Sequence, residues 1–129
     1  MNRELNARKH IRRKKIFRFA DSSEKEAIRK IALALSTLSE IEKVVVFGSR
    51  VRGDFDAFSD LDVLVVVKEI AVRHRVIHAL HEIEIAYDIP LSPVIYTIME
   101  YAMNKKLKSK FIANVEREGI IIYDAHRSG

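Results

Sequence analysis

The chain has 129 residues, which is enough for one domain, because single domains cluster near ~100–150 residues. Its 48% hydrophobic and 32% charged residues, with only four glycines and two prolines, exclude a collagen-like, low-complexity or wholly disordered chain. No apolar run reaches the ~18–20 residues of a membrane span, and residues 1–20 lack the apolar core of a signal peptide, so we expect no membrane contact. The absence of cysteine excludes disulfides and thiolate metal sites and agrees with a cytoplasmic location.

The formal charge of +5 is concentrated at the N-terminus. Residues 1–20 contain eight basic side chains and one acidic side chain, whereas the other 109 residues contain 15 basic and 17 acidic ones. Such a basic arm is usually a solvated segment and less often a contact for RNA or an acidic partner. We therefore divide the chain into an arm, residues 1–20, disordered or helical, and a domain, residues 21–129.

The first half of the domain predicts one helix and two strands. Ser23 and Glu26 have the spacing of a capping box, and apolar residues follow at helical spacing, which predicts a helix over residues 23–38. The apolar runs at residues 44–47 and 61–67 predict strands that are buried on both faces. The polar stretch between them predicts a loop with room for one helical turn.

The second half continues the alternation. We expect a helix over residues 70–87 that ends before Pro90, a strand at 94–96, a helix from Met99 to about Arg117, and a strand at 120–123. Gly119 is expected to end the last helix as its C′ glycine. The order α-β-β-α-β-α-β predicts one α/β layer structure without a second domain.

The segment from Val44 to Val67 contains the residues that indicate chemistry. The first strand ends at Gly48 and Ser49, and a loop of ten residues leads to Asp60-Leu61-Asp62 at the start of the next strand. Side chains alternate along a strand, so Asp60 and Asp62 point to one face, about 6–7 Å apart. Two such carboxylates repel each other unless a cation lies between them, and hard oxygen ligands of this kind suit Mg²⁺.

The residues around this pair suit phosphate. Gly48 allows the main chain to approach a ligand closely, Ser49 offers a hydroxyl and an amide, and Arg50 and Arg52 offer guanidinium groups. Two other phosphate motifs are excluded, because Gly53 is not followed by Lys-Ser/Thr and no Gly-x-Gly-x-x-Gly occurs. The alternative is that the aspartates of this loop only keep a turn soluble; the combined pattern favours a metal-triphosphate site.

Gly48-Ser49, ten intervening residues and Asp60-x-Asp62 resemble the signature of the DNA polymerase beta nucleotidyltransferase superfamily, and the short chain resembles its minimal nucleotidyltransferase branch. The resemblance implies a mixed sheet flanked by helices that binds ATP and Mg²⁺, with two metal ions. It implies that Asp60 and Asp62 are catalytic metal ligands. It further implies that Gly48 and Ser49 hold the β,γ-phosphates, supported by the turn that contains Arg50, Arg52 and Gly53.

The resemblance also implies a third carboxylate on the next strand, as metal ligand and base for the acceptor hydroxyl. Ser92 stands at the expected position, and the nearest acids are Asp88 and Glu84. Minimal members of the family often act beside a small helical HEPN-type protein, and some are antitoxins that adenylylate that toxin. Two hypotheses follow: an enzyme that transfers AMP to a hydroxyl of a partner protein, or a degenerate module that binds nucleotide or partner and acts by contact.

Two further clusters have simpler interpretations. His74, His78 and His81 share a helix face, which suits a transition metal or a partner but is more typical of an exposed face. Four lysines near residues 105–110 suit nucleotide or an acidic partner but are more typical of a solvated face. Those lysines are Lys105, Lys106, Lys108 and Lys110.

Overall fold

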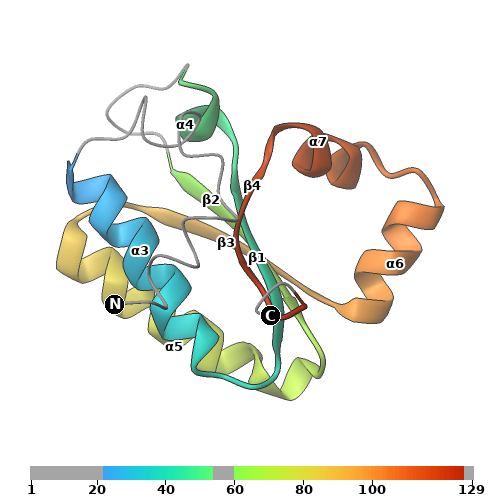
Figure 1. Ribbon diagram of the computed structural model, residues 1–129, viewed down its shortest axis with the longest axis horizontal. Coiled ribbons are helices and arrows are strands. Elements are labelled where there is room, and N and C mark those ends of the chain that lie inside the picture. Colours follow the sequence, from blue (N-terminus) through green and yellow to red (C-terminus); the bar gives the residue numbers. More distant parts are fainter. Residues whose placement is uncertain (1–21, 54–59, 127–129) are drawn as a thin grey trace.

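A four-stranded mixed sheet forms the centre of the molecule (Figure 1). The computed structural model describes residues 22–53 and 60–126, and of Arg52 only the backbone. The strands are β1 (Ile41–Phe47), β2 (Leu61–Val67), β3 (Leu91–Thr97) and β4 (Ile120–Asp124), in the spatial order β3-β2-β1-β4. β2 is parallel to β3, and β1 is antiparallel to both β2 and β4. The mixed α/β fold expected from the sequence is confirmed.

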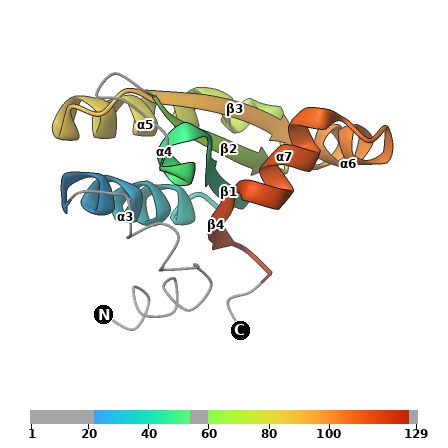
Figure 2. The ribbon, with the colours of Figure 1, turned by 90° about the horizontal axis from the view of Figure 1, so that it is seen from above.

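Helices cover both faces of the sheet (Figure 2). α3 (Ser22–Ser36) and α5 (Arg73–Tyr87), which follows a short 3₁₀ helix at Ile70–Val72, lie on one face. α6 (Ile98–Lys106) and α7 (Lys110–Glu118) lie on the other face. The one-turn helix α4 (Ser49–Arg52) follows β1 directly, which confirms the single turn allowed for in that loop. Among the described helices none is long and apolar enough to cross a membrane.

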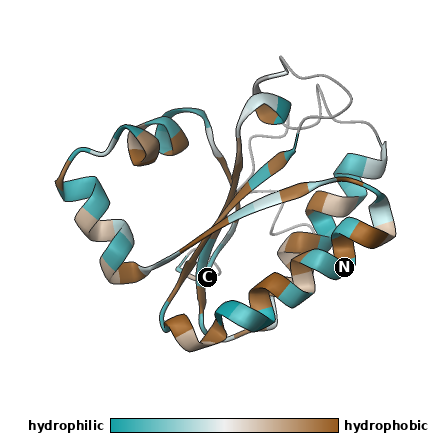
Figure 3. Cartoon of the chain, turned by 180° about the vertical axis from the view of Figure 1, so that it is seen from behind, coloured by the Kyte–Doolittle hydropathy of each residue, from teal (hydrophilic) through white to brown (hydrophobic). Residues whose placement is uncertain are grey.

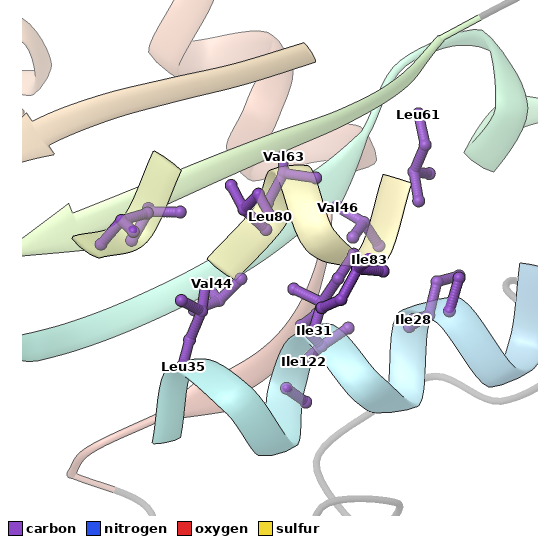
Figure 4. Close-up of a cluster of buried hydrophobic side chains, with 14 of the residues drawn as sticks. Ile28, Ile31, Leu35, Val44, Val46, Leu61, Val63, Leu80, Ile83 and Ile122 are labelled. Carbon is purple, nitrogen blue, oxygen red and sulfur yellow. The ribbon is translucent and has the colours of Figure 1, made fainter. Parts of the chain in front are cut away.

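The larger core lies between the sheet and the helices α3 and α5 (Figure 4). Alternate residues of the strands point toward α3 and α5 and pack against apolar residues that recur at helical spacing on these helices. Each of the two helices is therefore amphipathic. The fully buried members shown in Figure 4 include Ile31, Leu35, Val44, Val46, Val63 and Ile122. The side chains of alternate residues on β1 and β2 therefore point toward this face.

A smaller cluster lies on the opposite face, under α6 and α7. It contains Val45, Leu64, Val66 and Val115, and Phe111 of α7 packs edge-on against Phe47 and Tyr96 with ring centroids 5.5 Å and 6.1 Å apart. Both β1 and β2 are therefore buried on both faces, as predicted. Figure 3 shows the hydrophobic residues running along the central strands, with hydrophilic residues alternating on the helices.

The single helix expected from Met99 to Arg117 is wrong, because the chain turns between α6 and α7. Lys108 adopts a left-handed conformation (φ 58°), and the Ser109 hydroxyl accepts a hydrogen bond from the Ile112 amide as the N-cap of α7. A serine that caps a new helix competes with continuation of the old one. Compared with the expected order α-β-β-α-β-α-β, the structure has two helices instead of one before the last strand, and it also has the short helix α4.

Two expected helix ends also differ in the structure. Ser23 is the second residue of α3 and not its N-cap, and Glu26 instead pairs with Arg29 one turn later. Gly119 follows α7 in an extended conformation (φ −74°) rather than the left-handed one. A Cβ on Gly119 would lie 2.4 Å from the Val115 carbonyl oxygen and 2.6 Å from Val45 Cγ1, so close packing explains the glycine.

β3 is longer than expected, since it includes Ser92 and Pro93. Pro93 is exposed and β3 lies at the edge of the sheet, where a residue without an amide hydrogen is tolerated. The basic arm at residues 1–20 lies outside the described residues, so its disorder or helicity, and the RNA contact considered for it, stay predictions.

Candidate nucleotide and metal site

The turn after β1 closes tightly around Gly48. Gly48 is buried and has φ 92° and ψ −167°. A Cβ on Gly48 would lie 2.0 Å from Oδ2 of Asp62, the residue paired with Phe47 across the two strands. Because a side chain would meet both an unfavourable φ and the carboxylate, only glycine fits here. The main chain of Gly48 and the carboxylate of Asp62 therefore lie against each other.

Ser49 begins α4 next to this glycine. The Val51 amide donates to the Gly48 carbonyl at 3.1 Å, and the Gly53 amide donates to the Ser49 carbonyl at 2.9 Å. Val51 is buried in the larger core, and Gly53 ends the turn with φ 90°. Ser49 is half-buried and is held beside Gly48 by this turn, in which the side chain of Val51 is anchored in the core. The side chain of Arg52 lies outside the described part of the chain, as do residues 54–59.

Asp60 and Asp62 lie where β2 begins. Asp60 is exposed and precedes the strand, and Asp62 is half-buried within it. The neighbours of Asp62, Leu61 and Val63, belong to the core under α3 and α5, so Asp62 points to the face of α6 and α7. The Leu61 amide donates to the Pro90 carbonyl at 2.9 Å, which fixes the start of β2 against the start of β3.

Ser92 lies directly beside Asp62, because the two are paired in the parallel register of β2 and β3. The family resemblance placed Ser92 at this position, where a third carboxylate would otherwise stand. No residue of β3, from Leu91 to Thr97, is acidic. Ser92 adds a hydroxyl to the site, which can ligate or donate a hydrogen bond but brings no negative charge.

The two nearby acids of the sequence do not replace the third carboxylate in the structure. Glu84 of α5 accepts a hydrogen bond from the Leu91 amide at 2.9 Å and lies 3.5 Å from His81. α5 covers the face opposite to Asp62, so Glu84 holds the edge of β3 instead. Asp88 is exposed and ends α5 in a left-handed conformation (φ 53°).

The sequence predicted that Arg50 offers its guanidinium group to phosphate, but the side chain of Arg50 is buried and does not lie open to solvent. Its Nη1 donates to Oε1 of Glu24 at 2.6 Å, and both side chains are buried. Glu24 lies in the first turn of α3. Glu24 was not among the residues predicted for the site, although a glutamate on the apolar side of the expected helix was the available signal.

The histidine face of α5 is exposed and lies beside glutamates of the same helix. His78 lies 3.6 Å from Glu82, and all three of His74, His78 and His81 are exposed. Within residues 22–53 and 60–126, no three or more His, Asp or Glu side chains are grouped so that they could hold a metal. The preference for an ordinary exposed face therefore agrees with the structure.

A polar cluster that the sequence did not indicate joins α6 to α7. The Tyr101 hydroxyl donates to Glu116 at 2.7 Å, and Lys105 pairs with the same carboxylate oxygen at 3.2 Å. The hydrogen bond from Tyr101, helped by Lys105, holds the pKa of Glu116 below its usual value. Burial and the bond to Glu116 raise the pKa of Tyr101. Lys105, one of the four clustered lysines, is thus part of the fold.

The strands β1 and β2 bring the glycine turn and the Asp-x-Asp pair to one end of the sheet, which is the arrangement that the sequence resemblance implied. The chain belongs to the nucleotidyltransferase domain family, which matches residues 28–122. This result confirms the resemblance to the DNA polymerase beta superfamily.

Named relatives agree with this class. The chain is similar to two proteins of Methanocaldococcus jannaschii, each named a putative protein adenylyltransferase. One is 35% identical over 100 residues, covering 74% of this chain and 94% of the relative. The other is 30% identical over 103 residues, covering 78% and 99%. A solved structure of a putative nucleotidyltransferase from Sulfolobus solfataricus has a TM-score of 0.44 at 22% identity, covering 83% of this chain and 91% of that one.

Proposed function

We propose that this nucleotidyltransferase transfers AMP from ATP to a hydroxyl group of a protein side chain, in the cytoplasm. The observation that carries the proposal is the contact between the Gly48 turn and the Asp62 carboxylate, which puts the proposed phosphate turn directly beside a proposed metal ligand. The names of the two Methanocaldococcus jannaschii relatives support protein as the acceptor.

Gly48 and Ser49 are proposed to hold the β- and γ-phosphates of ATP. Gly48 has no side chain to keep the phosphates away, and Ser49 offers a hydroxyl from the anchored turn. Arg52 and Gly53 belong to the same turn, so we assign them to nucleotide binding with it. Because α4 is fixed by Val51, this surface is preorganised before ATP arrives.

Asp60 and Asp62 fit Mg²⁺. The ion usually takes one or two protein carboxylates and completes its shell with water and substrate phosphates, which is the donor set at the start of β2. When bound, such ions neutralise the charge of the transferring phosphoryl group, and we expect two of them. The protein's own contribution is to hold both carboxylates beside the phosphate turn.

The acceptor hydroxyl must lose a proton, and β3 offers Ser92 rather than a carboxylate. We propose that the acceptor protein supplies this group, and that the acceptor is a small helical HEPN-type partner. An acceptor that completes the site restricts transfer to the cognate complex, since catalysis needs a positioned base.

A second candidate function rests on the same serine. Without a third carboxylate, the site would bind ATP, or only the partner, and neutralise the partner by contact, as a degenerate antitoxin would. The two candidates share the nucleotide site but differ in whether the partner becomes covalently labelled.

The test is a transfer assay with the full chain, Mg²⁺, α-labelled ATP and a co-purified HEPN-type partner. We expect label on the partner, and we expect its loss with Asp60→Asn and with Asp62→Asn. Asp88→Asn, which changes an exposed aspartate outside the site, is the matched control and should label normally. ATP binding without label on any partner would overturn transfer in favour of the contact mechanism.

A further inference from the structure

Two charged side chains are buried among the apolar residues of the protein. Glu24 is 5% exposed and Arg50 is 9% exposed, and they are the buried polar residues among residues 22–53 and 60–126. All the other buried side chains there are apolar. A buried charge is costly unless it is paired and hydrogen-bonded, and the 2.6 Å bond between Arg50 and Glu24 satisfies this condition.

Glu24 occupies a core position of α3. It lies three and four residues before the buried Ala27 and Ile28, so it continues the apolar face of the helix. An apolar side chain would suit this place, and replacing buried ion pairs by apolar residues is often neutral or stabilising. The presence of the pair is therefore weak evidence for a role in stability alone.

Arg50 connects Glu24 to the phosphate turn. Arg50 is the second residue of α4, between Ser49 and the buried Val51. Val51 fixes one side of this four-residue turn in the core, and the bond from Arg50 to α3 fixes another. Two anchors in different directions set the rotation of the turn, and with it the direction in which Gly48 and Ser49 face.

We propose that Glu24 is a positioning residue that holds, through Arg50, the Gly48–Ser49 turn in the orientation that receives the phosphates of ATP. The inference rests on the proposed nucleotide site. Glu24 itself does not contact ATP. Arg50 serves binding by supporting the turn from the side of α3, since its Nη1 is bonded to Glu24.

A double-mutant cycle on ATP binding tests this inference. Binding of ATP with Mg²⁺ is measured by calorimetry for the full-length wild type, Glu24→Ala, Arg50→Met and the double variant, well below the melting temperature of each. Glu24→Ala should weaken binding about tenfold, because misplacement by ~1 Å has large effects on aligned groups. In the Arg50→Met background the same change should cost less than about twofold, because coupled residues are not additive.

Two further variants separate positioning from general damage. Glu24→Gln keeps an oxygen that accepts from Arg50 and should recover binding to within about threefold of the wild type. Glu26→Ala removes a half-buried glutamate of the same helix that pairs with Arg29 and not with the phosphate turn, and it should bind ATP normally.

Each result decides the matter. Additive losses in the cycle, unchanged binding in Glu24→Ala, or tighter binding because Arg50 is released to the phosphates would each overturn the inference. If Arg50→Met does not fold, the charge exchange Glu24→Arg with Arg50→Glu replaces it, and failure of that folded chain to recover binding over Glu24→Ala contradicts the proposal. The wild-type measurement tests the proposed function separately, because a wild type that binds no ATP overturns that function and not only the role of Glu24.

Discussion

The two faces of the sheet are covered to different depths. On the face of α3 and α5, one continuous apolar cluster extends from Ile28 to Ile122 with little exposure. On the face of α6 and α7 the cluster is smaller, and Met99, Met103 and Leu107 of the α6 segment are exposed. The difference separates a face that stabilises the domain from a face that remains accessible.

The candidate site lies on the accessible face. Asp62 and Ser92 point to the side of α6 and α7, whereas Leu61 and Val63 hold β2 from the other side. A site for ATP and a protein acceptor needs open space above the carboxylates and a rigid support beneath them. The core under α3 and α5 provides the support, and above it Asp60 is exposed and Asp62 is half-buried.

The largest effect is expected for Asp62→Asn. This change removes one negative charge beside Gly48 but keeps the size of the side chain, so the fold should persist while transfer falls on the order of 10³-fold. Single-turnover assays with labelled ATP, with circular dichroism as the folding check, measure both quantities. Transfer within tenfold of the wild type would place the chemistry elsewhere.

Matched isoleucine truncations compare the supports of the two faces. Ile31 of α3 and Ile112 of α7 are both almost fully buried. Ile31→Ala should lower the free energy of unfolding by about 4 kcal/mol, and Ile112→Ala by about 2 kcal/mol, since a cavity under the thinner layer collapses more easily. Urea unfolding of both variants gives the comparison, and equal losses would show that both layers are equally rigid.

The polar cluster between α6 and α7 predicts a dependence on pH. Tyr101→Phe should lower the free energy of unfolding by about 1 kcal/mol at pH 7, because Glu116 loses its hydrogen-bond donor. The pKa of Glu116 is lowered in the folded protein, so its contribution is present above its ordinary pKa of 4.5 and is lost as pH falls through the folded value. The difference between wild type and Tyr101→Phe should therefore shrink as the pH is lowered below 4.5; a constant difference would exclude Glu116 as the cause.

The positions of the candidate site residues were easier to predict from the sequence than the buried side chains that support them. Gly48 and Asp62 lie in one short segment, so strand alternation and one turn were sufficient to bring them together, whereas Asp60 precedes β2 and strand alternation does not fix its side chain. The bond between Glu24 and Arg50 spans 26 residues and depends on how α3 packs against the sheet, which local patterns do not encode. The break between α6 and α7 had a local signal in Ser109, the N-cap of α7, but the left-handed conformation of Lys108 before it is rare for a residue other than glycine and was not expected.

The smallest effect is expected for Met99→Gln. Met99 is 82% exposed on α6, so the free energy of unfolding should change by less than about 0.5 kcal/mol. Met99 also lies two residues beyond the end of β3, whose other end carries Ser92 beside the site. If an acceptor protein contacts the accessible face, Met99→Gln should weaken transfer to that acceptor while leaving ATP binding unchanged. Measuring ATP affinity, transfer and unfolding on the same variant distinguishes an accessible face that contacts the acceptor from one that is only thinly covered.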